Sequence, residues 1–281
     1  AQAPAPPWAP GCTLFPAGNV WNTPVRDLPV RSDSDRLIAA IGLDAALHPD
    51  FSDAGRYGIP FNVVTRRTKR VRVRFDYAAE SDRVAYPIPA RPRIEGGSDR
   101  HILMVDRDRC RLYELFAARR QGGRWVAGSG ATWDLRSNRL RPAGWTSADA
   151  AGLPILPGLV RYDEAARGVI RHALRFTAPS SRNAYIYPAR HQAGDADASL
   201  PPMGLRVRLK RSTSLAGFGP QARIVLTALR DYGMILADNG SPWYVSGAPN
   251  PGWDDDDLHA LGRITGADFE VVDTTGLRST P

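Results

Sequence analysis

The sequence is short of several residue types that would narrow the function. Its 281 residues include only two cysteines and only two lysines, Lys69 and Lys210, and no apolar run is long enough to cross a bilayer. The cysteines, Cys12 and Cys110, are too few and too far apart for a structural zinc site or a CxxC redox motif. These absences argue against a membrane-spanning helix and against dithiol chemistry.

Motifs that would assign a reaction are also missing. The chain has no GxSxG nucleophile elbow, no P-loop, no dinucleotide fingerprint and no HExxH zinc motif. We therefore expect no cofactor and no metal. Acid–base chemistry by carboxylates and histidines remains as the main route to catalysis.

The start of the chain indicates export. It opens with Ala-Gln-Ala-Pro-Ala-Pro-Pro and lacks Met, which is typical of a chain left by signal-peptide cleavage. We expect a secreted protein, extracellular or periplasmic, with an extended arm over residues 1–12 and a single β-rich domain over residues 13–281. In an exported chain two cysteines usually pair, so we predict a disulfide between Cys12 and Cys110.

The formal net charge is +8, and arginine carries nearly all of the positive charge. The basic run comprises Arg66, Arg67, Lys69, Arg70, Arg72 and Arg74. Its strand-like alternation favours a solvated strand face rather than a binding strip. We expect a monomer with no nucleic-acid partner and no membrane partner.

Strand patterns dominate the chain, with turn signals between them. The expected strands cover residues 57–64, 71–77, 101–105, 111–118, 124–134, 169–177, 184–187 and 205–209. Asn239-Gly240 predicts a hairpin that joins residues 234–238 to residues 241–246. Residues 137–158 form a long irregular segment, and such ordered loops are often functional.

Helices are few. Residues 34–41 are one candidate, and the four aspartates at 254–257 open another. The clearest helix covers residues 220–232, where Val225, Leu229 and Tyr232 form an apolar stripe. The predicted class is mainly β: a β-sandwich of the jelly-roll type with one or two packed helices, or alternatively a double-psi-type β-barrel.

Long motifs distributed over almost the whole chain carry a resemblance. They are Leu14-Phe15-Pro16, Asn19-Val20-Trp21-Asn22, His48-Pro49-Asp50-Phe51, Tyr57-Gly58-Ile59-Pro60, Asp99-Arg100-His101, Leu112-Tyr113-Glu114-Leu115, the segment 143–149, Arg171-His172-Ala173-Leu174-Arg175-Phe176, Tyr232-Gly233 and Asp238-Asn239-Gly240. In these motifs the chain resembles an uncharacterised family of secreted proteins from actinobacteria, myxobacteria and relatives. The resemblance implies export and no particular reaction.

Glu114 is the first candidate catalytic residue. In its strand it shares a face with Leu112 and Phe116, which are both apolar. This position favours an acid that points into a cleft, where burial would raise its pKa as a general acid requires. A structural ion pair is the alternative.

Asp134 and Asp238 are the candidate second carboxylates. Asp134 lies on the expected partner strand and faces opposite to Glu114 unless a bulge reverses it. Asp238 precedes the Asn-Gly turn, where stabilising the turn is the alternative role. For Asp149, a capping box with Thr146 is a sufficient explanation.

His172 shares a strand face with Leu174, which fits either a core histidine or a general base. Whether His101, His172 and His191 converge on a metal stays open. Aromatic and polar side chains near the candidate acids suit a sugar ligand. The candidate substrate-binding residues are Trp133, Trp145, Arg175, His191, Asn239 and Trp243.

Glycosidic cleavage needs one acid and a second carboxylate. The sequence therefore predicts a secreted, polysaccharide-degrading glycoside hydrolase. Its candidate catalytic residues are Glu114, Asp134, Asp238 and His172. A polysaccharide lyase, or a non-catalytic carbohydrate-binding or cell-surface protein, is the alternative. In each case the partner is a polysaccharide or oligosaccharide.

Overall fold

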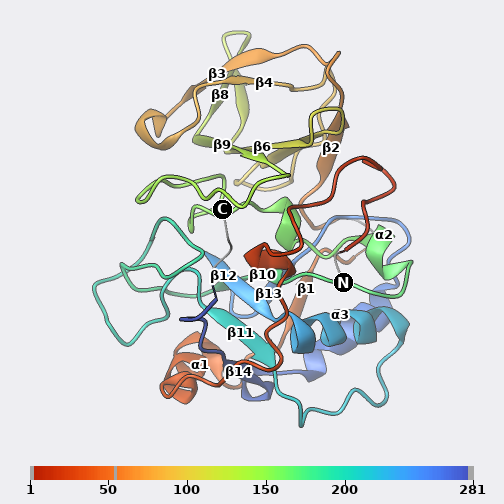
Figure 1. The fold of residues 1–281 in the computed structure, drawn as a ribbon, viewed down its shortest axis with the longest axis vertical. Helices are drawn as coiled ribbons and strands as arrows, with labels where there is room; N and C mark the ends of the chain where they lie inside the picture. The colour runs from red at the N-terminus through yellow and green to blue at the C-terminus, as the bar shows by residue number, and fades with distance from the viewer. Residues whose placement is uncertain (1–2, 54–55, 278–281) are drawn as a thin grey trace.

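The computed structural model describes residues 3–53 and 56–277, which form mainly β-strands in three mixed sheets (Figure 1). The largest sheet lies in the lower half of Figure 1. Its six strands, in spatial order, are β1 (His48–Asp50), β13 (Tyr244–Ser246), β10 (Leu174–Ala178), β12 (Met234–Asn239), β11 (Arg206–Leu209) and β14 (Phe269–Val271). The central strands β10 and β12 are parallel, and the apolar run that opens β12 is buried, as a central strand requires.

Two four-stranded sheets occupy the upper half of Figure 1. One has the order β2 (Phe61–Val64), β5 (Ile102–Asp106), β6 (Arg111–Phe116) and β9 (Ser129–Asp134). The other has the order β4 (Ala85–Tyr86), β3 (Val71–Phe75), β8 (Arg124–Ala127) and β7 (Arg119–Gln121). A separate apolar core, which includes Phe75, Met104 and Leu115, joins these two sheets.

The predicted β-rich class with few helices is confirmed. Within the described residues none of the sheets closes on itself, so the alternative of a double-psi-type barrel is wrong. Each sheet also contains at least one parallel pair, whereas jelly rolls are antiparallel. The jelly-roll sandwich stays a prediction.

The predicted hairpin around Asn239-Gly240 is wrong. Strands β12 and β13 are not neighbours, because β10 lies between them and pairs with both. The turn passes over the end of β10: the Gly240 amide donates to the Ala178 carbonyl, and the Thr177 hydroxyl donates to the Ser241 carbonyl. Residues 184–187, another expected strand, form only an isolated bridge between Tyr185 and Met203.

The α-helices are α1 (Ser34–Gly42), α2 (Tyr162–Ala165), α3 (Pro220–Asp231) and α4 (Asp255–His259). Short 3-10 helices are η1 (Val20–Asn22), η2 (Ala78–Glu80), η3 (Leu156–Gly158), η4 (Ala260–Arg263) and η5 (Gly266–Asp268). In α3, Val225 and Leu229 are fully buried and Tyr232, which follows the helix, packs against the same core. The predicted packing of this helix against the large sheet is confirmed.

The Cys12–Cys110 disulfide is present, with 5.3 Å between the Cα atoms. The arm that precedes it is not merely extended, because residues 7–11 turn and Ala9 is fully buried in the larger core. The Trp8 ring lies 4.8 Å from the ring of Phe61. The division into arm and domain stays an interpretation. No helix among the described residues is long and apolar enough to cross a membrane.

Candidate functional site

A cavity of about 300 Å³ is lined by residues from both halves of the molecule. The upper half contributes Glu80 of η2, Phe116 of β6 and Ser129 of β9, and the large sheet contributes Asp238 at the end of β12. Residues 146–150 and His191 complete the wall. This volume is at the lower end of the roughly 300–1,000 Å³ range of small-molecule pockets.

The irregular segment that lines the cavity is held by its own polar groups. The Ser147 hydroxyl lies within hydrogen-bond distance of the Asp149 and Leu153 carbonyls, at 2.9 and 2.6 Å. The Ser129 hydroxyl bonds to the Ser147 carbonyl at 2.5 Å. Buried backbone groups need such partners, and these bonds order a segment that has neither helix nor strand structure.

An arginine lies behind the cavity wall. Arg175 of β10 is 5% exposed and donates to both oxygens of Asp149, each at 2.6 Å. A further guanidinium nitrogen donates to the hydroxyl of Ser246 on β13. The expected capping box at Asp149 is wrong, because no helix follows Thr146 and the Asp149 carboxylate binds Arg175 instead.

Asp238 is the cavity carboxyl whose ionisation is most altered. Burial, the negative charge of Asp149 and a hydrogen bond with Asp149 raise its pKa from 3.8 to about 7, although Arg175 lies 3.7 Å away. Its side chain still has 28% of its surface exposed. Asp238 can therefore hold a proton near neutral pH and remain accessible to a ligand.

A histidine–carboxylate pair lines the same cavity. His191 Nδ1 donates to the Ala150 carbonyl at 2.7 Å, so in the neutral ring the lone pair is on Nε2. That Nε2 lies 3.6 Å from Glu80, whose carboxylate accepts the Thr146 amide at 3.1 Å. The backbone thus fixes a base and a carboxylate on a wall that also includes Asp238.

Two aromatic rings add apolar surface to the cavity. Tyr77 lines it and is 58% exposed, and Phe116 lines it from the end of β6. An exposed aromatic face next to polar groups suits a ligand with both apolar and hydroxyl surface, such as a sugar ring.

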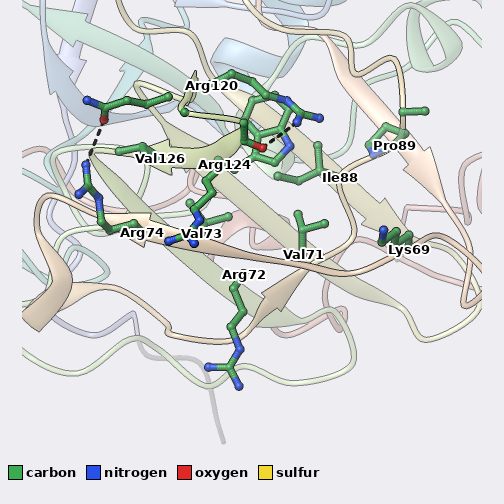
Figure 2. A pocket seen from close by; sticks show the side chains of 15 residues that line it. Lys69, Val71, Arg72, Val73, Arg74, Ile88, Pro89, Arg120, Arg124 and Val126 are labelled. Carbon is green, nitrogen blue, oxygen red and sulfur yellow. Dashed lines mark hydrogen bonds between the residues drawn. The ribbon is translucent and has the colours of Figure 1, made fainter.

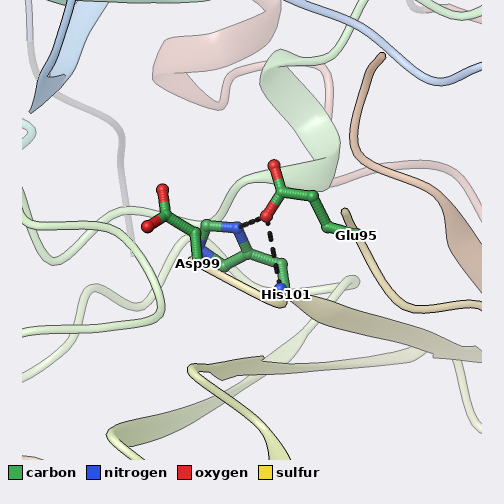
Figure 3. Close-up of side chains that lie close together, drawn as sticks. All are labelled: Glu95, Asp99 and His101. Carbon is green, nitrogen blue, oxygen red and sulfur yellow. Dashed lines mark hydrogen bonds and ion pairs between the residues drawn. The ribbon is translucent and has the colours of Figure 1, made fainter. Parts of the chain in front are cut away.

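His101 belongs to a separate polar cluster with Glu95 and Asp99 (Figure 3). Figure 3 shows Glu95 bonded to the ring of His101, with Asp99 beside it. Among the described residues this is the one group of three that could hold a metal, and neither His172 nor His191 belongs to it. The other ring nitrogen of His101 bonds to the Ala148 carbonyl at 2.9 Å, so both nitrogens have partners.

That ion pair governs the charge of His101. Burial lowers the pKa of the imidazole, but the hydrogen bond and charge of Glu95 outweigh it and raise the pKa to about 9. A metal bound here would have to displace the proton from His101 and its hydrogen bond with Glu95. In this structure His101 and Glu95 form an ion pair that supports the cavity wall through Ala148.

Glu114 does not lie in a groove, so that expectation is wrong. Its side chain is fully buried and accepts the backbone amides of Ile155 and Leu156 at 2.8 and 2.9 Å. Burial raises its pKa to about 7 against the opposing effect of these amides. Glu114 anchors the irregular segment from beneath, where a polymer has no access to it.

The other two predicted catalytic residues also lie elsewhere. Asp134 is exposed at the end of β9 and lies opposite Arg111 in the register of β6 and β9. Its side chain therefore points to the other face of the sheet from Glu114, as expected. Its carboxylate accepts the Arg136 amide, which stabilises a turn. His172 is buried between the Ala173 carbonyl and the carboxylate of Glu164, at 2.7 and 2.9 Å. It is a core histidine with both nitrogens satisfied.

Of the predicted sugar-binding residues, the structure brings His191 to the cavity, Arg175 behind it and Asn239 beside Asp238. Trp243 is fully buried between Phe176 and Phe269, so its predicted contact with substrate is wrong. Trp133 is also buried, at 6% exposed.

Trp145 lines a different hollow from the candidate cavity. Trp145 and Trp133 both lie near the guanidinium of Arg141, which is 5.6 and 5.7 Å from their ring centres. Sequence reasoning missed Glu80, Tyr77 and the role of Asp149. The sequence feature that did point to the cavity is the long irregular segment 137–158, which supplies part of the cavity wall.

No family model, no curated protein and no solved structure matches this chain. The function must therefore be argued from the cavity itself.

Proposed function

We propose that the protein is a secreted enzyme that hydrolyses glycosidic bonds with the paired carboxyls of the cavity. Asp238 acts as the acid that protonates the leaving oxygen, and Glu80 with His191 acts as the base that takes a proton from the attacking water. The observation that carries the proposal is a cavity that two carboxyls, Asp238 and Glu80, both line, and the raised pKa of Asp238, to about 7, supports it. Tyr77 offers a face for the sugar ring.

Export is part of the proposal and is supported by the Cys12–Cys110 disulfide, since disulfides persist in oxidising compartments. A lyase would need a group that neutralises a uronate carboxylate. Among the described residues, the lining of the cavity includes no lysine or arginine. This composition favours hydrolysis over elimination.

The test is the variant Asp238→Asn against a panel of bacterial and plant polysaccharides, with reducing ends as the readout. Asparagine keeps an oxygen that accepts the Asn239 amide, but it cannot give up a proton. We expect the rate to fall on the order of 10²–10⁴-fold. In the parent enzyme the rate should decline as the pH rises through about 7, where Asp238 loses its proton.

The matched control is Asp134→Asn, which makes the same change at an exposed carboxylate outside the cavity lining. It should cleave at the parental rate. Parental cleavage by Asp238→Asn would overturn the assignment. Sugar binding without cleavage of any member of the panel would favour a carbohydrate-binding protein, and products with an absorbing double bond would favour a lyase.

A further inference from the structure

A second, larger hollow lies on the upper half of the molecule and shares no lining residue with the cavity. It is an open groove of about 940 Å³ formed by β3, β7, β8 and residues 88–90 (Figure 2). The cations that line it are Lys69, Arg72, Arg74, Arg120 and Arg124. No aspartate or glutamate is among the lining residues that the structure describes.

These cations lack acidic partners. Across residues 3–53 and 56–277, none of the five forms a salt bridge with a carboxylate. Arg74 donates to the Gln121 amide oxygen at 3.0 Å, and Arg120 to the Gly123 carbonyl at 3.1 Å. Both partners are neutral. Concentrated positive charge without counter-charge raises the local concentration of anions.

We propose that this groove, called here the arginine groove, binds a linear anionic polysaccharide through its carboxylate or sulfate groups. Arginine forms two parallel hydrogen bonds with such planar or multidentate anions. Figure 2 shows Lys69 at one end of the arginine groove and Arg74 at the other, with Arg124 between them and Arg72 turned away. Cations at both ends suit an extended polymer better than a compact anion.

The lining disfavours the other polyanions. Single-stranded nucleic acids bind through exposed aromatic rings on which bases stack. Trp125, the aromatic residue in the lining, is only 9% exposed, and Arg120 covers it at 4.9 Å from the ring centre. Membrane surfaces need protruding apolar side chains. None of the exposed large apolar residues of the described chain lines the arginine groove.

A short stretch of chain joins the arginine groove to the cavity. Strand β3 carries Arg74 near its end, and the chain continues directly into Tyr77 and Glu80, which line the cavity. Three residues span at most about 11 Å, so Arg74 and Tyr77 lie within that distance along the chain. The end of the arginine groove at Arg74 is therefore only a few residues along the chain from the cavity lining. The binding itself requires no catalysis and stands apart from the proposed hydrolysis.

The solvated strand face expected from the sequence accounts for the exposure of Arg72 and Arg74. It does not account for a groove lined by cations from three strands and a loop, with no acid among the described lining residues. The concave shape distinguishes a binding surface from an ordinary charged face.

The test measures binding of fluorescently labelled polygalacturonate, chondroitin sulfate, neutral dextran and single-stranded DNA by anisotropy at low and physiological salt. The test variant is Lys69→Gln, Arg74→Gln and Arg124→Gln combined. The control combines Arg66→Gln, Arg67→Gln and Arg107→Gln, which removes three exposed charges outside the groove lining.

We expect the parent to bind one or both acidic glycans and not dextran, with affinity that falls as salt rises. The groove variant should bind roughly tenfold more weakly, and the control should bind like the parent. Chondroitin sulfate carries sulfate as well as uronate groups, so tighter binding of chondroitin sulfate than of polygalacturonate would show that sulfate adds to the binding. Equal loss in both variants, tighter binding of DNA than of either glycan, or no binding to acidic glycans would each overturn the proposal. Glycan binding by an Asp238→Asn variant would separate this result from the fate of the proposed hydrolysis.

Discussion

Replacing Arg175 with methionine should destabilise the protein strongly. Arg175 neutralises the carboxylate of Asp149, which is only 1% exposed, through two hydrogen bonds of 2.6 Å. Methionine fills part of the same volume but leaves Asp149 buried without a counter-charge. Breaking a buried pair in this way costs about 3–5 kcal/mol, far more than losing an exposed ion pair.

Equilibrium unfolding in urea measures this effect as a lower midpoint with an unchanged slope. The double variant Asp149→Asn with Arg175→Met should recover part of the loss, because it removes the unpaired charge as well. The coupling between the two sites, obtained from both single variants and the double variant, should exceed about 1 kcal/mol. The reasoning would be refuted if Arg175→Met lowered the free energy of unfolding by less than about 1 kcal/mol, or if the effects of the two single variants were additive.

The same variant tests the electrostatics of the cavity. Arg175 lowers the pKa of Asp238, while burial and Asp149 raise it. Without the guanidinium, the pKa of Asp238 should rise further above about 7. Titration of Asp238 by NMR in a folded Arg175→Met sample measures this shift, and a downward shift would contradict the assigned causes.

Two further predictions concern stability. Leu229→Ala should cost roughly 2–5 kcal/mol, because Leu229 is fully buried in α3, whereas Thr227→Ala on the exposed side of that helix should change little. The His101–Glu95 pair should stabilise the fold by up to about 3 kcal/mol below pH 6.5, and this stability should disappear as the pH rises through about 9. Urea unfolding across this pH range measures it. Glu95→Gln should remove the decline in stability that His101 contributes between about pH 6.5 and 9.

The sign of the pH effect follows from the proton count. The folded state keeps a proton on His101 up to about pH 9, whereas the unfolded chain releases it near 6.5. Between these values the folded state binds more protons, so raising the pH weakens it. Stability that increases with pH across this window in the parent, beyond that seen in Glu95→Gln, would contradict the ion pair.

Local signals in the sequence predicted the features that depend on local chemistry. Pro220 begins α3 and Gly233 follows its end, as helix-terminal preferences require. The apolar stripe identified its buried face, and the cysteine count identified the disulfide. These predictions needed no knowledge of which strands become neighbours.

Glu114 shows where such reasoning ends. Alternation placed it correctly on the inner face of β6, because Leu112 is buried on the same side. Whether an inner face meets a cleft or a core depends on what covers it. Here the backbone of Ile155 and Leu156 covers Glu114. These two residues follow Glu114 by 41 and 42 positions in the chain, and no local pattern in the sequence predicts so distant a contact.

The cavity depends on the same long-range order. Arg175 lies on β10, Asp238 on β12 and Ser246 on β13. Strand β10 lies between β12 and β13, the two strands that the Asn-Gly turn connects, so Arg175 contacts residues of both. A hairpin between β12 and β13 would have kept Arg175 outside that pair of strands. The parallel pairing of β10 with β12 instead brings a guanidinium beside the last residues of β12, where Asp149 binds it fully and leaves Asp238 only partly neutralised. The proton on Asp238 near neutral pH, which the proposed hydrolysis requires, comes from burial and from Asp149, and the guanidinium that the strand order brings beside Asp238 opposes it without removing it.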